Sequence, residues 1–245
     1  MTEPLLDIRN LSKRFGGFVA LDGIDLSVVA GERVGLIGPN GSGKSTLVNC
    51  ICGTLANETG SVRFAGAAID GLPAHERTRR GVARSFQLPR PFASLTVAEN
   101  LRVPLLYTVN ARPGTHLAAA QLDARCADLL ALVGLATKAA QYPRDLTQVE
   151  MRKLELARAL AAEPKLLIAD EAMAGLSNSE VADIVALLIS LNERGITIIL
   201  IEHIMRAVMS FSQRLVVLVS GRKIADGRPD EVIHDAEVEK AYLGQ

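Results

Sequence analysis

The sequence has few aromatic residues and no tryptophan: only 4% of its 245 residues are Phe, Tyr or Trp. Its 27 Lys and Arg balance its 27 Asp and Glu, so the formal net charge is zero. A protein that binds nucleic acid usually presents a basic surface, often with exposed rings on which bases stack. Both features are lacking here, and we therefore expect no nucleic-acid partner.

Long hydrophobic runs are also lacking, since none approaches the roughly 18 residues that a transmembrane helix needs. Met1-Thr2-Glu3-Pro4 carries no basic residue, so we expect no secretory signal and a cytosolic chain. If the protein acts at a membrane, other polypeptides must span it. The four histidines show no metal-ligand spacing. The three cysteines suit neither a disulfide framework nor a metal site, and we expect all three to be small core residues: Cys50, Cys52 and Cys126.

One glycine-rich stretch carries most of the information in the chain. Residues 38–45 match the pattern G-x-x-x-x-G-K-[ST], and another hydroxyl residue, Thr46, follows. The apolar run Arg33–Ile37 precedes the stretch and is typical of a buried strand. Residues 45–55 carry spaced apolar side chains and no proline, as a helix would. Strand, glycine loop and helix together predict a P-loop, which binds nucleotide phosphates.

The residue types of this loop suit phosphate chemistry. Glycines let backbone N–H groups approach a phosphate, and the start of the following helix adds unpaired N–H groups. Lys44 is expected to reach the β- and γ-phosphates, and the Ser45 hydroxyl is expected to sit on Mg²⁺. The predicted nucleotide-binding residues of the loop are Gly38, Pro39, Asn40, Gly41, Ser42, Gly43, Lys44, Ser45 and Thr46.

Short apolar runs alternate with amphipathic segments along the second half of the chain. We expect buried strands at 166–170 and 196–201. A hairpin is expected around Ser220-Gly221-Arg222. Helices are expected at 117–133, from 147 to before 164, and from 179 to 195. The alternation predicts an α/β fold of the P-loop NTPase type, with a mostly parallel, RecA-like sheet covered on both faces.

Two segments are expected to depart from this alternation. The first 30 residues alternate apolar and polar side chains between expected turns at Gly16-Gly17, Asp22-Gly23 and Ala30-Gly31, and with Val62-Arg63-Phe64 they predict a small antiparallel sheet beside the P-loop. Prolines at positions 89, 91, 104 and 113 are expected to break the middle of the chain into short pieces. We therefore assign residues 1–88 and 160–245 to the nucleotide-binding core and residues 89–159 to a helical insertion subdomain.

Two carboxylates end the predicted strand at 166–170. Ligands of open α/β sheets bind at the carboxyl ends of the strands. Asp170 is therefore expected to hold Mg²⁺ through water, and Glu171 to orient or deprotonate the attacking water. Such a pair is a weak signal alone and a strong one beside a P-loop. His203 follows the strand at 196–201 by two residues, which places it at the same edge, within reach of a γ-phosphate.

In these motifs and their order the chain resembles the ATPase subunits of ABC transporters over nearly all of its length. The resemblance implies that residues 1–245 form one ATPase domain. It implies that Phe15 stacks on adenine, although a core position is the alternative for a phenylalanine. It also implies that Gln87, in Arg84-Ser85-Phe86-Gln87, senses Mg²⁺ and water and couples to a membrane subunit. His203 matches the switch histidine of the family.

Three stretches are similar to the ATPases of branched-chain amino acid importers and their relatives for urea and amides: residues 83–87, Leu95–Leu101 and Ala241–Gly244. The last is also similar to the ATPase of the lipopolysaccharide-extraction machine. This subgroup implies ATP and Mg²⁺ as cofactors, and a place at the cytoplasmic face of the inner membrane. It implies transmembrane permease subunits docking at residues 87–92 and the helical insertion, a second ATPase subunit in a heterodimer or homodimer, and a solute-binding protein acting indirectly.

Other functions remain open from the sequence. They are the ATPase of another ABC system, such as lipid or lipopolysaccharide extraction, a non-transport ATPase of translation or repair, and an assembly subunit that binds ATP without hydrolysing it. The last two are disfavoured because the chain is one compact ATPase and because Lys44, Glu171 and His203 are present.

The chain departs from the family where it is expected to meet the second subunit. Leu146–Glu150 stands in place of the usual signature L-S-G-G-Q. Thr147 keeps a hydroxyl that can touch phosphate, whereas Gln148-Val149 replaces the glycine pair. Thr147 and Glu150 are expected near the partner's nucleotide, where Glu150 adds negative charge unless it folds back to cap its helix. We expect either that the chain's own P-loop forms the stronger of two unequal sites or that both sites hydrolyse ATP.

Overall fold

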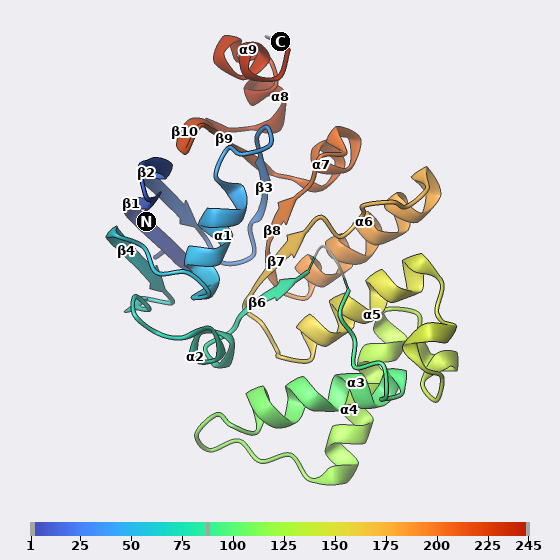
Figure 1. Ribbon diagram of the computed structural model, residues 1–245. Coiled ribbons are helices and arrows are strands. Elements are labelled where there is room, and N and C mark those ends of the chain that lie inside the picture. Colours follow the sequence, from blue (N-terminus) through green and yellow to red (C-terminus); the bar gives the residue numbers. More distant parts are fainter. Residues whose placement is uncertain (1–2, 87–88, 244–245) are drawn as a thin grey trace.

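The computed structural model describes residues 3–86 and 89–243, and this part of the chain folds into two sheets with helices between and around them (Figure 1). A four-stranded antiparallel sheet has the order β2-β1-β4-β5, and a six-stranded sheet has the order β10-β9-β3-β8-β7-β6. The expected α/β class with an antiparallel element and a mostly parallel main sheet is confirmed.

The six-stranded sheet is parallel except at one edge, where β9 and β10 form the expected hairpin. The central strands are buried along almost their whole length, which explains their continuous apolar runs. Because β3, β8, β7 and β6 are parallel neighbours, their carboxyl ends meet at one edge of the sheet. In sheet order the strands are β10 (Arg222–Gly227), β9 (Arg214–Val219), β3 (Arg33–Ile37), β8 (Thr197–Ile201), β7 (Leu166–Asp170) and β6 (Val82–Ser85).

The antiparallel sheet contains a bulge where the sequence predicted a turn. Its strands are β1 (Leu6–Phe15), β2 (Phe18–Val28), β4 (Thr59–Phe64) and β5 (Ala67–Ala68). The expected turn at Asp22-Gly23 is wrong, because β2 continues through these residues. Gly23 adopts a φ of +64°, the β1–β2 register shifts beside it, and its N–H donates to Ser12 Oγ at 3.0 Å. The glycine thus absorbs an extra residue without ending the strand.

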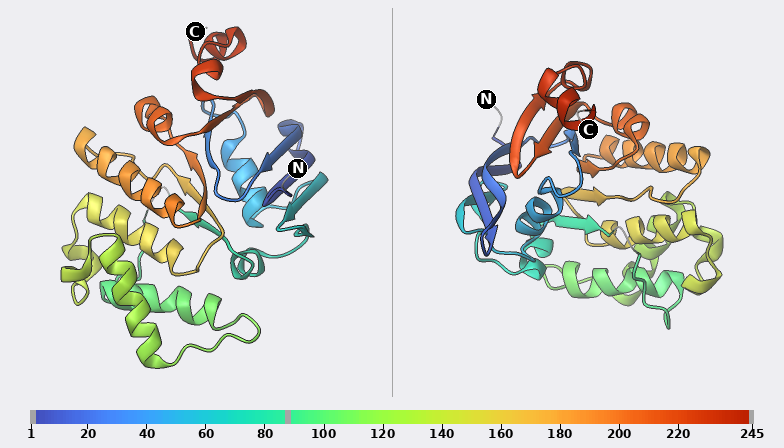
Figure 2. Two further views of the ribbon diagram at one scale, coloured as in Figure 1. Left: turned by 180° about the vertical axis from the view of Figure 1, so that it is seen from behind. Right: turned by 45° about the horizontal axis from the view of Figure 1, so that its top comes forward.

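The helix that follows the glycine loop, α1 (Lys44–Cys52), lies between the two sheets, as Figure 2 shows. Its apolar residues, from Leu47 to Ile51, share one core with both sheets. The other face of the large sheet is covered by α5 (Gln148–Leu160), α6 (Asn178–Glu193) and α7 (Met205–Phe211), which build a second core. The helix that follows the glycine loop is thereby held between the two sheets.

A group of helices packs beside α5 at the far end of the sheet (Figure 1). Its members are α3 (Val97–Pro104), η1 (Leu105–Val109), α4 (Ala119–Leu132), η2 (Ala136–Lys138) and η3 (Pro143–Asp145). The remaining helices are α2 (Ala74–Arg79), α8 (Pro229–Val232) and α9 (Ala236–Leu243). No helix in the described ranges is long and apolar enough to cross a membrane. The boundaries assigned above to the helical insertion stay a prediction.

Pro104 does not break the chain, so this expectation is wrong. The helical backbone of α3 continues past Pro104 into the π-helical turn η1, where Asn110 N–H donates to Leu105 O at 3.0 Å. A proline lacks the N–H that an α-helix needs and crowds the preceding turn. The helical backbone nevertheless continues, and the wider π-turn lies directly after the proline.

The candidate nucleotide site

Two glycines fix the shape of the loop between β3 and α1. A Cβ on Gly38 would lie 2.1 Å from Leu218 O, and a Cβ on Gly43 would lie 2.6 Å from Ala20 O. Both residues also have φ values in the region that favours glycine, +155° and +105°. The loop is held from outside as well, because Gly221 N–H donates to Ser42 O at 3.0 Å. No other residue type fits these two positions, so the predicted loop has the rigid backbone that phosphate binding needs.

Lys44 points back into the loop. Its Nζ donates to Gly38 O at 2.7 Å and to Pro39 O at 3.1 Å, and its side chain is buried. Burial lowers the pKa of Lys44, while the carboxylates of Glu171 and Asp170 act in the opposite direction. The Lys44 ammonium is held by two carbonyl oxygens and could exchange them for phosphate oxygens.

Glu171 and His203 form a pair at the edge where β7 and β8 end. His203 Nε2 lies 3.2 Å from Glu171 Oε1. Glu171 has a φ of +48°, which is unusual for a residue other than glycine, and its N–H donates to Ile201 O at 2.9 Å. Uncommon backbone geometry that the sheet enforces is often found at functional sites. The structure thus brings the predicted catalytic glutamate and histidine into contact.

Glu202 is a buried residue at this edge that the sequence analysis missed. Its Oε1 accepts a hydrogen bond from Met173 N–H at 2.8 Å. Burial raises the pKa of Glu202. The contact ties the segment after Glu171 to the end of β8. The sequence did contain a signal for this residue, because Glu202 stands directly between an apolar strand and His203.

The donors near Asp170 fit Mg²⁺. Asp170 ends β7 as a buried carboxylate, and Ser45 offers a hydroxyl in the first turn of α1. In the ranges covered by the structure, no cluster of three or more His, Cys, Asp or Glu could hold a metal by itself. Mg²⁺ prefers oxygen ligands and usually takes one or two from the protein, with the rest from phosphates and water. The residues therefore suit a metal that arrives with a nucleotide.

Three other predicted site residues fall outside this constellation. Gln87 lies outside the described residues. Phe15 is 51% exposed at the end of β1, so the alternative of a core position is wrong, and Lys13 Nζ lies 5.7 Å from its ring centroid. Thr147 is the N-cap of α5, which covers the opposite face of the large sheet from α1, the helix that follows the glycine loop. The structure therefore does not bring Thr147 to the loop of its own chain.

Glu150 caps its own helix, which is one of the two expectations for it. Its Oε2 accepts a hydrogen bond from Thr147 N–H at 2.8 Å, and its Oε1 lies 2.7 Å from Lys138 Nζ. The hydrogen bond from Lys138, followed by that from Thr147, lowers the pKa of Glu150. The Lys138 ammonium offsets the charge of a carboxylate that would otherwise repel a phosphate near this helix end.

We expect Glu150→Gln to lower the free energy of unfolding at pH 7 by about 0.5–1 kcal/mol, because glutamine can still cap the helix but loses the ion pair. A carboxylate with a depressed folded-state pKa stabilises above its unfolded pKa, near 4.5, and loses this contribution as pH falls through the folded pKa. Urea denaturation should therefore show a difference that shrinks below about pH 4.5. Lys138→Met should cause a similar loss that does not add to that of Glu150→Gln. Full additivity would contradict the pairing.

A glycine loop opening a helix, with a carboxylate, a glutamate–histidine pair and a buried lysine at one sheet edge, defines a P-loop nucleotide-binding protein. The sequence model of the family described as ABC transporter (ABC_tran) matches residues 21–174. The chain belongs to the ABC transporter family.

Individual relatives match along the whole chain. It is 37% identical to the high-affinity branched-chain amino acid transport ATP-binding protein BraF of Pseudomonas aeruginosa, over 100% of both chains. It is 35% identical to the corresponding protein LivG of Escherichia coli K12, again over 100% of both. Among solved structures, the ADP conformation of MJ1267, an ATP-binding cassette of an ABC transporter, has a TM-score of 0.88 and 32% identity over 100% of both chains.

Proposed function

We propose that this chain is the ATP-hydrolysing subunit of an ABC importer for branched-chain amino acids or related small amides. The observation that carries the proposal is the Glu171–His203 pair, at the sheet edge where Asp170 ends β7. The full-length similarity to BraF and LivG supports the solute class. An assembly subunit that only binds ATP would have no need of a glutamate oriented in this way.

The chain's residues have separate tasks in this function. The loop 38–46 binds the phosphates through backbone N–H groups, and Lys44 moves from the carbonyls of Gly38 and Pro39 to the phosphate oxygens. Asp170 and Ser45 would hold Mg²⁺, which would supply positive charge to offset that of the β- and γ-phosphates. Phe15 stacks on adenine, and Gln87 senses the metal and water.

Glu171 orients the attacking water and accepts its proton, and His203 keeps the carboxylate in place and contacts the γ-phosphate. Thr147 and Glu150, remote from this loop, approach the nucleotide of a second ATPase subunit. Their departure from the usual signature favours a heterodimer of unequal sites over a homodimer. Such an assembly would work at the cytoplasmic face of the inner membrane and respond indirectly to a solute-binding protein.

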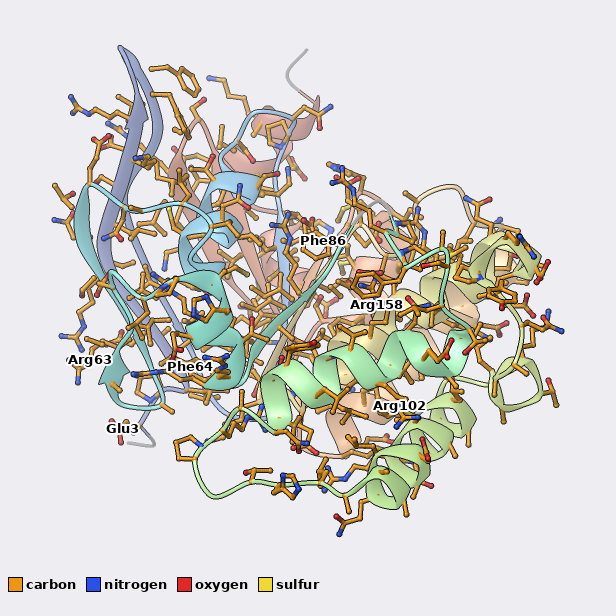
Figure 3. The ribbon with its side chains drawn as sticks, turned by 60° about the horizontal axis from the view of Figure 1, so that its bottom comes forward. Glu3, Arg63, Phe64, Phe86, Arg102 and Arg158 are labelled. Carbon is orange, nitrogen blue, oxygen red and sulfur yellow. The ribbon has the colours of Figure 1, made fainter. Side chains whose placement is uncertain are left out.

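A groove of about 340 Å³ is the place where we propose that the permease docks. It lies between β6, α2, α3 with η1, and α5, and its wall is mainly apolar. Phe86, Phe92 and Tyr107 line it and are 50%, 42% and 73% exposed. Arg158 adds a cation, and Figure 3 shows it near Phe86, where the sheets meet the helical group. Exposed aromatic rings around an apolar groove are typical of a protein-binding surface.

Co-purification with the permease tests this function. We expect the assembled complex to hydrolyse ATP faster when a branched-chain amino acid and its binding protein are added. Tyr107→Ala should reduce permease binding by about tenfold or more, because it removes a large aromatic anchor. The matched control is Leu106→Ala, an exposed neighbour that does not line the groove. Equal effects of the two substitutions would contradict docking in this groove, and an ATPase rate that no tested solute changes would contradict the solute class.

A further inference from the structure

Arg84 joins three elements of the nucleotide site by hydrogen bonds. From β6, its Nε and Nη2 both donate to Asp170 Oδ2 on β7, at 3.1 and 2.5 Å. Its Nη1 donates to Asn49 Oδ1 on α1 at 2.7 Å. Only 17% of the Arg84 side chain and 9% of the Asp170 side chain are exposed. A forked, charge-assisted contact of this kind fixes the carboxylate firmly.

Arg84 also lines the groove proposed above as the permease site. Arg84 and Phe86 both line it, and the Arg84 guanidinium lies 5.4 Å from the centroid of the Phe86 ring. Phe86 is half exposed, so a segment seated in the groove would contact it. Figure 3 shows the Phe86 ring at the boundary between the core and the helices. One guanidinium thus lies between an exposed aromatic ring and the buried Asp170.

A guanidinium at this distance opposes a second cation at the same carboxylate. It occupies Oδ2 of Asp170 with two donors, and its charge repels a divalent ion in a partly buried setting where screening is weak. Mg²⁺ can approach Asp170 more easily when the arginine is absent or displaced. Contact on Phe86 is one way to displace it, because the ring and the guanidinium are held together by cation–π attraction.

We propose that Arg84 is a positioning residue that restrains Asp170 from taking Mg²⁺, and that a partner segment pressing on Phe86 in the groove releases this restraint. The inference rests on the proposed function, since it takes the groove as the permease site and Asp170 as the Mg²⁺ carboxylate. Binding of a partner segment in the groove would then affect Asp170 through the side chains of Phe86 and Arg84.

The test measures how ADP binding to the isolated full-length chain depends on Mg²⁺. Calorimetric titrations measure the affinity for ADP at a series of free Mg²⁺ concentrations. The midpoint is the Mg²⁺ concentration at which this affinity has changed by half. ADP is used because the ATPase does not hydrolyse it. We expect Arg84→Met to lower this midpoint about tenfold, because a neighbouring positive charge is removed. Arg84→Lys keeps the charge but replaces the three bonding nitrogens of the guanidinium by one, so its midpoint should lie between those of Arg84→Met and the unchanged chain.

Two aromatic residues provide matched variants for the groove. Phe86→Ala should lower the midpoint about two- to threefold, since its cation–π partner is the arginine on Asp170. Phe92 also lies in the groove under an arginine, but that residue, Arg158, is 5.1 Å from its ring and bonds Glu155 instead of Asp170. Phe92→Ala should leave the midpoint unchanged. Arg112→Met controls for loss of an ion-paired, partly buried arginine elsewhere.

Each outcome has a definite meaning. An unchanged or raised midpoint in Arg84→Met, or equal shifts for Phe86→Ala and Phe92→Ala, overturns the inference while nucleotide binding still stands. Failure of the unchanged chain to bind ADP at any Mg²⁺ concentration overturns the proposed function instead. Thermal unfolding shows which variants fold, and if Arg84→Met does not, Arg84→Lys and Phe86→Ala carry the same comparison.

Discussion

Replacing Glu171 by glutamine is expected to slow ATP hydrolysis by about 10²–10⁴-fold, because the amide cannot accept a proton from the attacking water. ATP affinity should stay close to its original value, because Lys44 and the glycine loop are unchanged. Phosphate release by the assembled transporter measures the first effect, and calorimetry with ATP measures the second. The substitution is nearly isosteric, so the hydrogen bond from the Glu171 N–H to Ile201 O should persist.

The same substitution tests whether the two sites of the assembly are unequal. If this chain's P-loop forms the stronger site, Glu171→Gln should remove most of the ATPase activity and transport, whereas the equivalent change in the second subunit should remove less. The exposed Glu193→Gln, at the end of α6, controls for loss of a carboxylate elsewhere. ATPase activity and transport that survive Glu171→Gln largely intact would refute both the catalytic role and the inequality.

Replacing Lys44 by alanine is expected to weaken ATP binding by about 10²–10⁴-fold, since hydrogen bonds to charged groups contribute about 1.5–3 kcal/mol each and lysine would make two or more. The fold should tolerate the change. Burial lowers the pKa of Lys44, so the folded chain holds this ammonium at some cost, and its removal relieves that cost.

Calorimetry with ATP and Mg²⁺ measures the loss of affinity, and thermal unfolding without nucleotide measures stability. Lys165→Ala, at an exposed lysine before β7, is the matched control and should bind ATP normally. Nucleotide affinity that is retained in Lys44→Ala would show that the glycine loop is not the phosphate site. Loss of folding in Lys44→Ala would instead contradict the reasoning from its pKa.

The sequence predicted the parts of the fold that rest on strong local signals. Buried parallel strands such as β7 and β8 must be apolar on both faces, and such runs stand out. The helix beginning at Thr147 was predicted from its capping-box spacing, which the structure contains. The same spacing occurs at Thr96 and Glu99, yet α3 was missed, because the nearby prolines were given more weight than the cap.

The remaining misses concern features that only tertiary contacts decide. Pro104 lies inside a helix that continues into a π-turn, and no local signal announces this. An Asp-Gly pair within β2 could be a turn or a bulge, and pairing with β1 made it a bulge.

The candidate site was predictable where one residue type has one chemical use. The glycine loop, Asp170, Glu171 and His203 were found because each stands at the end of an expected strand. Arg84 and Glu202 were missed in their structural roles, because their partners, Asp170 and Met173, are 86 and 29 residues away in sequence. Only the order of strands in the sheet brings such residues together.

Glu171 directly follows β7, His203 follows β8 by two residues, and every residue of these two neighbouring strands is buried. Closely packed, buried strands have few alternative arrangements. We therefore expect the distance between Glu171 and His203 to be set before a nucleotide binds. If this chain acts with a second ATPase subunit as proposed, we expect the rate of the cycle to depend on the association and separation of the two subunits. Substitutions that speed the association of the two subunits should then raise the turnover rate, whereas substitutions within the buried strands β7 and β8 should lower it.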